Sequence, residues 1–206
     1  MEGKKSFKER VKDTIVENAV AYNAYYVPYE YLLCSKSFKQ KPYYIISAHE
    51  DNYLHLTGVH TTLSAKAFFD KCLDGTLDES DFDFTKDGQE EKAVKGSVRR
   101  KINSLPAMMG IFNGSTMVEE DFSKNRIRCA FAAADSAVTV GFVVTGKARP
   151  MTLLKGNELN LSKAACLDLV LRRKKGEDKF SEVVIGTPDI LNQYRADLNH
   201  LLSVDI

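Results

Sequence analysis

The sequence has almost no net charge and no long apolar segment. Its 29 Lys and Arg residues nearly balance 28 Asp and Glu residues, which leaves a net charge of +1. So small a charge does not draw the whole molecule to nucleic acid or to a membrane, and attraction for a polyanion must come from local clusters. No apolar run approaches the roughly 20 residues needed to cross a bilayer, and the charged N-terminus, MEGKKSFKERVKD, lacks the apolar region of a signal peptide. We therefore expect a cytoplasmic protein with no membrane partner.

Closely spaced cysteines are also missing. The chain has no C-x-x-C pair, and its four cysteines lie far apart, at Cys34, Cys72, Cys129 and Cys166. This spacing argues against a disulfide framework and against a zinc site, so buried reduced thiols are the natural interpretation.

The motifs of several enzyme classes are absent as well. The chain contains no G-x-x-x-x-G-K-[ST], no G-x-G-x-x-G after a predicted strand and no G-x-S-x-G. A nucleotide-hydrolysing or dinucleotide-dependent enzyme therefore has no support, and we expect no cofactor.

Helical patterns dominate the first half of the chain. Residues 6–26 place apolar side chains at helical spacing, and residues 64–75 add a plausible N-cap, Ser64, and a plausible C-terminal stop, Gly75. A third helix is predicted over 90–105, where Pro106 should end it. The segment 26–41 resists assignment.

The second half favours strands. Short β-prone runs separated by turn residues fill 125–186, and strands joined by turns imply an antiparallel sheet. A last helix is predicted over 188–202, with Thr187 as N-cap and Pro188 at its first position. The prediction is one α+β domain over 1–206, with N-terminal helices packed on a curved antiparallel β-sheet and a C-terminal helix.

The segment PYYIISAHEDNYLHLTG, residues 42–58, predicts a β-hairpin around HEDN. In its second strand the alternation puts Leu54 and Leu56 against the helices. The opposite, solvent-facing side then carries Tyr53, His55 and Thr57.

Three histidines, His49, His55 and His60, lie close together in this region. Their spacing matches no common metal site, so no metal is expected. Half-exposed strands often carry polar side chains without a role. Alternatively, His55 is a general acid or base, because an unperturbed imidazole titrates at a pKa of about 6.5.

Basic residues form two clusters. Lys92, Lys95 and Arg99 share one stripe of the third predicted helix, with Arg100 beside it, and LRRKKGEDK places Arg172 and Arg173 at a predicted hairpin tip. Each cluster alone is more simply explained as solvated charge. Two such clusters in a nearly neutral chain nevertheless indicate phosphate binding weakly.

The stretch from Tyr43 to Leu77 resembles a known family. H-L-T-G followed by S-A-K-x-F-x-x-K-C-L-x-G-x-L is similar to the phage-type nuclease branch of the barnase–EndoU–colicin–RelE superfamily, and the later ARPMTLLKGN fits more loosely. The resemblance implies helices on a four- or five-stranded antiparallel sheet and a metal-independent ribonuclease of a mobile genetic element. Certain type II anti-CRISPR proteins of similar size deplete or truncate guide RNA, so RNA and a CRISPR effector ribonucleoprotein are the expected partners.

The resemblance supports His55 and Thr57 directly, Lys66 in the following helix less so, and Lys155 weakly. We expect His55 to transfer a proton, Thr57 to bond a phosphate oxygen and Lys155 to neutralise charge, with His60 as a candidate second proton-transfer group. The alternative is a non-catalytic anti-defence inhibitor that binds a protein or ribonucleoprotein on the same fold. The expected RNA-binding residues are Lys66, Lys95, Arg99, Arg100, Arg172 and Arg173.

The isolation of the cysteines predicts that all four are free thiols. Thiol titration in denaturant, on protein purified from a reducing compartment, should return four thiols per chain. A lower number would show that two cysteines are bridged or that one binds a metal.

Overall fold

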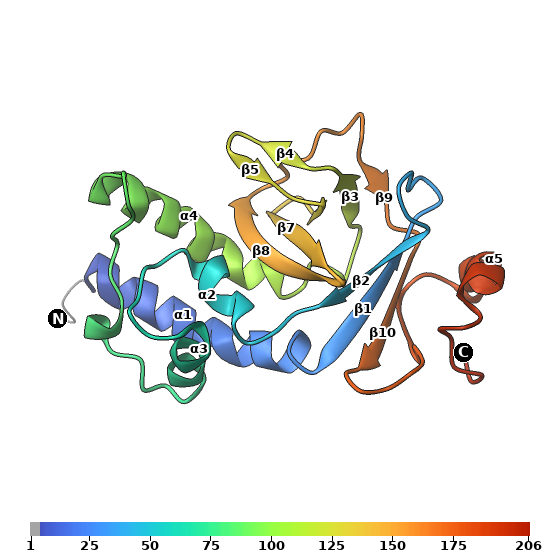
Figure 1. Ribbon diagram of the computed structural model, residues 1–206, viewed down its shortest axis with the longest axis horizontal. Coiled ribbons are helices and arrows are strands. Elements are labelled where there is room, and N and C mark those ends of the chain that lie inside the picture. The colour runs from blue at the N-terminus through green and yellow to red at the C-terminus, as the bar shows by residue number, and fades with distance from the viewer. Residues whose placement is uncertain (1–4) are drawn as a thin grey trace.

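The computed structural model describes residues 5–206. Figure 1 shows α1–α4 gathered on one side of a strongly curved sheet, with α5 on the other side. The helices are α1 (Phe7–Tyr25), α2 (Asn52–Thr57), α3 (Ala65–Leu73), α4 (Glu91–Met108) and α5 (Pro188–Leu198), with a 3-10 turn, η1 (Glu79–Asp81).

The strands lie mostly in the second half of the chain. They are β1 (Tyr29–Cys34), β2 (Tyr43–Ser47), β3 (Met117–Glu120), β4 (Ser123–Lys124), β5 (Ile127–Arg128), β6 (Phe131–Ala134), β7 (Val138–Thr145), β8 (Lys147–Lys155), β9 (Ala165–Cys166), β10 (Leu169–Lys174) and β11 (Glu182–Ile185). Nine of them form one sheet in the order β11-β10-β1-β2-β8-β7-β6-β3-β9. The predicted α+β class is confirmed, although the sheet has more strands than the four or five that the resemblance implied.

The long helices begin where their sequence signals predict. At α1 the Glu9 amide donates to the Ser6 hydroxyl at 3.0 Å, and the Ser6 amide donates to the Glu9 carboxylate at 2.6 Å, which is a capping box. Ser64 caps α3 and Thr187 caps α5 in the same way, through the side-chain oxygen.

Pro106 does not end α4, and this prediction is wrong. The helix continues to Met108, which is fully buried and whose carbonyl oxygen accepts a 2.6 Å hydrogen bond from the Tyr26 hydroxyl. Tertiary contacts at the helix end thus outweigh the local tendency of proline to stop it.

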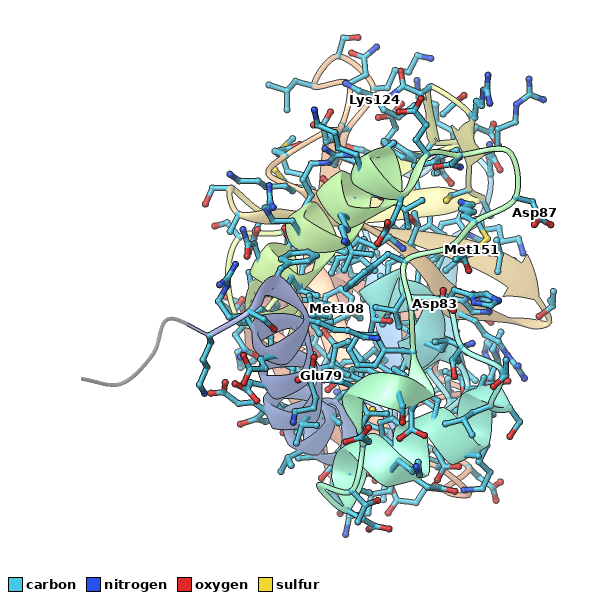
Figure 2. All side chains as sticks on the ribbon, turned by 90° about the vertical axis from the view of Figure 1, so that its left-hand side faces the viewer. Glu79, Asp83, Asp87, Met108, Lys124 and Met151 are labelled. Atoms are coloured by element: carbon cyan, nitrogen blue, oxygen red, sulfur yellow. The ribbon has the colours of Figure 1, made fainter. Side chains whose placement is uncertain are left out.

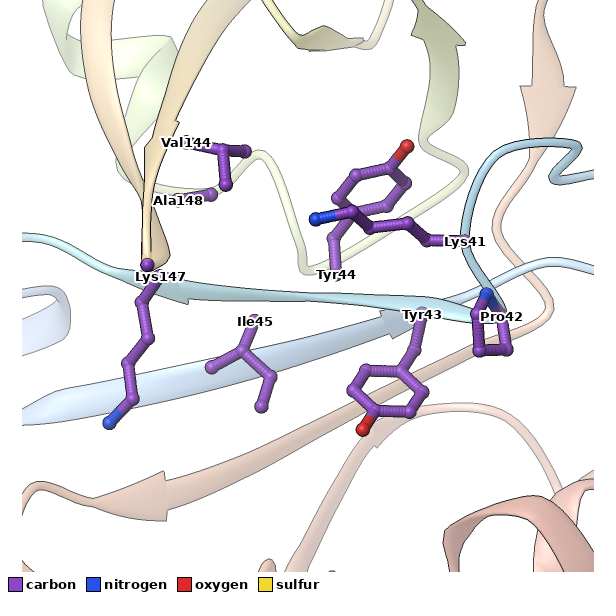
Figure 3. Close-up of a pocket in the computed structure, with 9 residues that line it drawn as sticks. Lys41, Pro42, Tyr43, Tyr44, Ile45, Val144, Lys147 and Ala148 are labelled. Carbon is purple, nitrogen blue, oxygen red and sulfur yellow. The ribbon is translucent and has the colours of Figure 1, made fainter.

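The sheet contains one weak junction, between β2 and β8, which separates β11-β10-β1-β2 from β8-β7-β6-β3-β9. Neighbouring strands of this sheet are antiparallel except β2 and β8, which run parallel and pair only at Ile46 and Ala148. Figure 3 shows the two strands diverging there, with Lys147 and Ile45 pointing to one side of the sheet and Val144 and Ala148 to the other.

Strand β1, within the unassigned segment 26–41, lies near the middle of the sheet and is buried on both faces. Tyr31 and Leu33 belong to the main core under the helices, whereas Leu32 and Cys34 belong to a smaller core beneath α5. A strand buried on both faces reads as a continuous apolar run and loses the alternation that identifies strands.

The predicted hairpin over 42–58 is wrong, because its second strand is the short helix α2. Tyr53, Leu56 and Thr57, at helical spacing, form the buried face, and only His55 is exposed. The expected solvent-facing row of Tyr53, His55 and Thr57 therefore does not exist. The sequence of a six-residue segment can match both the period of a strand and the period of a helix. Here the segment is helical, because that conformation buries its apolar side chains.

All four cysteines are free. Cys34, Cys72 and Cys129 are buried as expected, but Cys166 is exposed on β9, at the sheet edge. Burial raises the pKa of the Cys34 and Cys72 thiols to about 12. None of the helices within 5–206 is long and apolar enough to cross a membrane.

Glu30 holds three strands together. Its carboxylate lies on β1, accepts hydrogen bonds from Arg173 of β10 at 3.0 and 2.8 Å, and is paired with Lys147 of β8. The side chains of Glu30 and Arg173 are only 6% and 10% exposed. Burial alone would raise the pKa of Glu30, but the hydrogen bonds from Lys147 and Arg173 outweigh it and lower the pKa.

We expect Arg173→Gln to lower the free energy of unfolding by about 3 kcal/mol, the low end for breaking a buried pair, because Lys147 still neutralises Glu30. Urea denaturation measures the change. The matched control, Lys174→Gln, alters the exposed neighbour and should stay within about 0.5 kcal/mol of wild type. Adding Glu30→Gln should recover part of the loss; no recovery would show that the arginine acts through packing alone.

Candidate active site

Two of the predicted site residues meet in one cleft. His55, at the end of α2, and His60, two residues beyond Gly58, line a cavity of about 550 Å³ together with Lys101 of α4 and Met151 of β8. We call this the histidine cleft. Figure 2 shows Asp83 and Asp87, from the segment before α4, on the same side of the molecule as Met151.

His60 is held by a carboxylate. Its Nδ1 lies 3.0 Å from Asp83 Oδ1 and 3.1 Å from the Thr85 hydroxyl. The backbones of His60 and Asp83 also form an isolated β-bridge. Hydrogen bonds from Thr85, and then from His60, lower the pKa of Asp83. The carboxylate therefore stays charged and fixes the imidazole, as carboxylates orient catalytic histidines.

Lys101 is the residue that the sequence did not single out. Its side chain passes under Gly58, and its ammonium group donates to the backbone carbonyl oxygen of His55. Burial, and then the charge of Lys86, lower the pKa of Lys101 to about 8. A lysine that titrates near neutrality on the wall of a cleft is a candidate for functional chemistry.

Thr57 does not face the cleft. Its side chain is fully buried, and its hydroxyl donates to the Leu54 carbonyl oxygen at 2.8 Å. Thr57 and His55 were paired because alternate residues of a strand face the same side. In the helix α2 they face different sides, so this reason no longer applies. Lys155 is exposed at the far end of β8 and does not line the histidine cleft.

The predicted RNA-binding residues do not converge on the histidine cleft. On α4, Lys95 pairs with Glu91 at 2.7 Å, Arg99 lies over the Phe7 ring at 5.1 Å, and Arg100 is exposed. On α3, Lys66 contacts Glu50 at 2.9 Å and Asp70 at 3.0 Å.

Arg172 and Arg173 lie within β10 and not at a hairpin tip, so that placement is wrong. Arg172 bonds Glu182 at 3.0 Å and stacks on Tyr29, whereas Arg173 bonds Glu30. Both guanidinium groups therefore already have acidic partners. Among residues 5–206, no three His, Cys, Asp or Glu side chains are grouped as a metal site requires.

Gly58 combines a left-handed backbone, φ +75°, with close approach to Lys101: a methyl group there would lie 2.7 Å from Lys101 Cδ. Gly58→Ala should therefore lose stability from backbone strain, about 1–2 kcal/mol, and a further ~1 kcal/mol from the clash. Gly75→Ala is the control, because φ is +71° there and no atom lies within 4 Å. Urea denaturation compares the two variants.

In a Lys101→Ala background the extra loss at Gly58 should vanish. Equal losses for Gly58→Ala and Gly75→Ala in the wild-type background would instead show that Lys101 is not held against this turn.

A family model described as phage-Barnase-EndoU-ColicinE5/D-RelE like nuclease4 matches residues 14–195. Comparison with curated proteins and with solved structures gave no match. The matched range holds every strand, α2 to α4, and the whole histidine cleft. Because the model matches far more than half of the sequence, the chain belongs to the phage-Barnase-EndoU-ColicinE5/D-RelE like nuclease family.

Proposed function

We propose that the protein is a metal-independent ribonuclease and that the histidine cleft is its active site. Membership of a nuclease family makes nucleic acid the substrate class. The observation that carries the proposal is the meeting of His55, His60 and Lys101 around one cavity. Two imidazoles and a cation are what attack by a ribose 2′-hydroxyl on the neighbouring phosphate needs.

The chemistry assigns one proton transfer to each histidine. One imidazole takes the proton of the 2′-hydroxyl as its oxygen bonds to phosphorus, and the other protonates the 5′-oxygen as the P–O5′ bond breaks. His60, oriented by Asp83 through Nδ1, keeps Nε2 for the substrate. Because Asp83 orients the ring of His60, and no side-chain partner among residues 5–206 orients His55, we assign His60 as the acid and His55 as the base.

Lys101 supplies positive charge near the reacting phosphate. Because the pKa of Lys101 is about 8, its ammonium group is mostly protonated at pH 7. It loses its charge as the pH rises above about 8. Its link to the His55 carbonyl oxygen ties this cation to the end of α2. Thr57 and Lys155 have no part in this chemistry, because neither lines the cleft.

RNA is proposed over DNA because proton transfer by two histidines uses the 2′-hydroxyl as the nucleophile, and DNA lacks it. CRISPR guide RNA is the finer proposal that the sequence resemblance contributes, and it is tested as one substrate among several. A non-catalytic inhibitor that binds a ribonucleoprotein is the outcome to expect if no RNA is cleaved.

Cleavage of total RNA and of guide-type RNA in excess EDTA tests the proposal. His55→Ala and His60→Ala should each lower the single-turnover rate by about 10²–10⁴-fold while leaving RNA affinity unchanged, because each removes one proton-transfer group. The matched control is His200→Ala, an exposed histidine just after α5, far from the cleft in sequence. Asp83→Asn should lower the single-turnover rate less than His60→Ala does, because it weakens the contact that orients the imidazole and leaves the imidazole itself in place.

Three results would contradict the proposal. They are cleavage that EDTA abolishes, cleavage of an oligonucleotide with a 2′-deoxy sugar at the scissile position, and full activity in His55→Ala. Tight binding to a guide-RNA ribonucleoprotein without any cleavage would replace it with the inhibitor hypothesis.

A further inference from the structure

A second recess opens beside the first half of β8. It has a volume of about 280 Å³ and is lined by side chains from four segments that are distant in sequence, among them Glu30, His49, Lys147, Arg149 and Lys175. We call it the basic recess. One of its cations, Lys175, belongs to the LRRKKGEDK cluster, whereas Lys147 and Arg149 are isolated along the chain.

The basic recess carries more positive than negative charge. Its lining has three cations, Lys147, Arg149 and Lys175, and one carboxylate, Glu30, which leaves +2 without counting His49. Both oxygens of Glu30 are already bonded, one to Lys147 and the other to Arg173. The carboxylate therefore has little capacity left to neutralise the other cations.

Arg149 and Lys175 are the cations without an acidic partner. Within residues 5–206, Arg149 makes no side-chain hydrogen bond or ion pair, and the Lys175 ammonium donates only to the Ala48 carbonyl oxygen. The acids of the adjoining cavity are Glu50 and Asp51, and Glu50 is paired with Lys66 at 2.9 Å.

Neighbouring groups already respond to this charge. Burial, and then the charges of Lys175 and Arg149, lower the pKa of His49. Burial likewise lowers the pKa of Lys175; Arg149 and Lys147 act in the same direction, against Glu30 and Glu50. A bound anion would relieve this repulsion, which is how clustered cations select phosphate groups.

The basic recess lies next to the histidine cleft along β8. Arg149 lines the first and Met151 lines the second, and two residues of a strand span about 6.6 Å. Successive phosphates of a stacked strand advance by about 3.4 Å, so this offset corresponds to about two nucleotide steps. Figure 3 shows that Lys147 points to the same side of the sheet as Ile45 and Tyr43.

We propose that the basic recess binds a backbone phosphate of the RNA strand about two nucleotide steps from the phosphodiester that lies in the histidine cleft. Arg149 and Lys175 are the positioning residues, and Lys147 completes the site while it holds Glu30. The inference rests on the proposed ribonuclease function, and it adds a defined phosphate subsite about two nucleotide steps from the scissile bond.

The test is the salt dependence of binding to a single-stranded 2′-O-methyl RNA oligonucleotide, which cannot be cleaved through its 2′-oxygen. Arg149→Gln and Lys175→Gln should each reduce the log–log slope by about 0.7 units, the value for one phosphate contact of a single strand. Lys174→Gln is the matched control, because it removes the same charge from the exposed neighbour of Lys175 and should leave the slope unchanged.

The outcomes separate this inference from the proposed function. Reduced slopes for Arg149→Gln and Lys175→Gln support the phosphate subsite even if no RNA is ever cleaved. Unchanged slopes, or an equal reduction in Lys174→Gln, overturn the subsite even if His55-dependent cleavage is found. The subsite is also overturned if the oligonucleotide does not bind. The same holds if inorganic phosphate binds but Arg149→Gln and Lys175→Gln leave the salt dependence of RNA binding unchanged.

Discussion

The position of β8, which lines both the histidine cleft and the basic recess, depends on the buried carboxylate of Glu30. It lies on β1 and binds Arg173 of β10 and Lys147 of β8, so one acid joins three strands. The link to β8 matters most, because β8 meets β2 at a single parallel pair, Ile46 and Ala148. Few backbone hydrogen bonds hold β8 against β2 there, and the ion pair between Glu30 and Lys147 adds a contact between β1 and β8 at this junction. Strand β8 then places Arg149 in the basic recess and Met151 in the histidine cleft.

The second element that sets the geometry is α2. A helix of six residues has no stability of its own, so its conformation is imposed by what it contacts. Tyr53 and Leu56 are fully buried, and the Tyr53 hydroxyl donates to the Ile15 carbonyl oxygen at 2.6 Å. Gly58 turns the chain out of the helix just above the side chain of Lys101. His55 is thus placed by the core and by α4, and its position follows from tertiary contacts.

This dependence explains what the sequence could and could not predict. The longer helices were predictable because their apolar stripes and caps, such as Ser64 and Thr187, are local. The short helix α2 was not, since six residues satisfy both a strand and a helix pattern. His55 was chosen for its titratable side chain and by the family resemblance, and His60 for its closeness to His55 in the sequence. Asp83 could not be chosen in this way, because a β-bridge brings it to His60 from 23 residues away. Lys101 was hidden in a run of cations on α4, and only packing distinguishes it.

The run RRKK shows the same limit for electrostatics, because a strand divides consecutive charges between its two faces. Arg172 reaches Glu182 and Tyr29, whereas Arg173 turns to the opposite face and reaches Glu30. Lys174 is exposed again, and Lys175 enters the basic recess. Four like charges in sequence therefore have four different surroundings. Cations that already hold an acid gain little from a phosphate, since they must first give up that partner. Arg149, a lone arginine in sequence, faces no such loss, and this makes an isolated cation a better phosphate ligand than the run of charges.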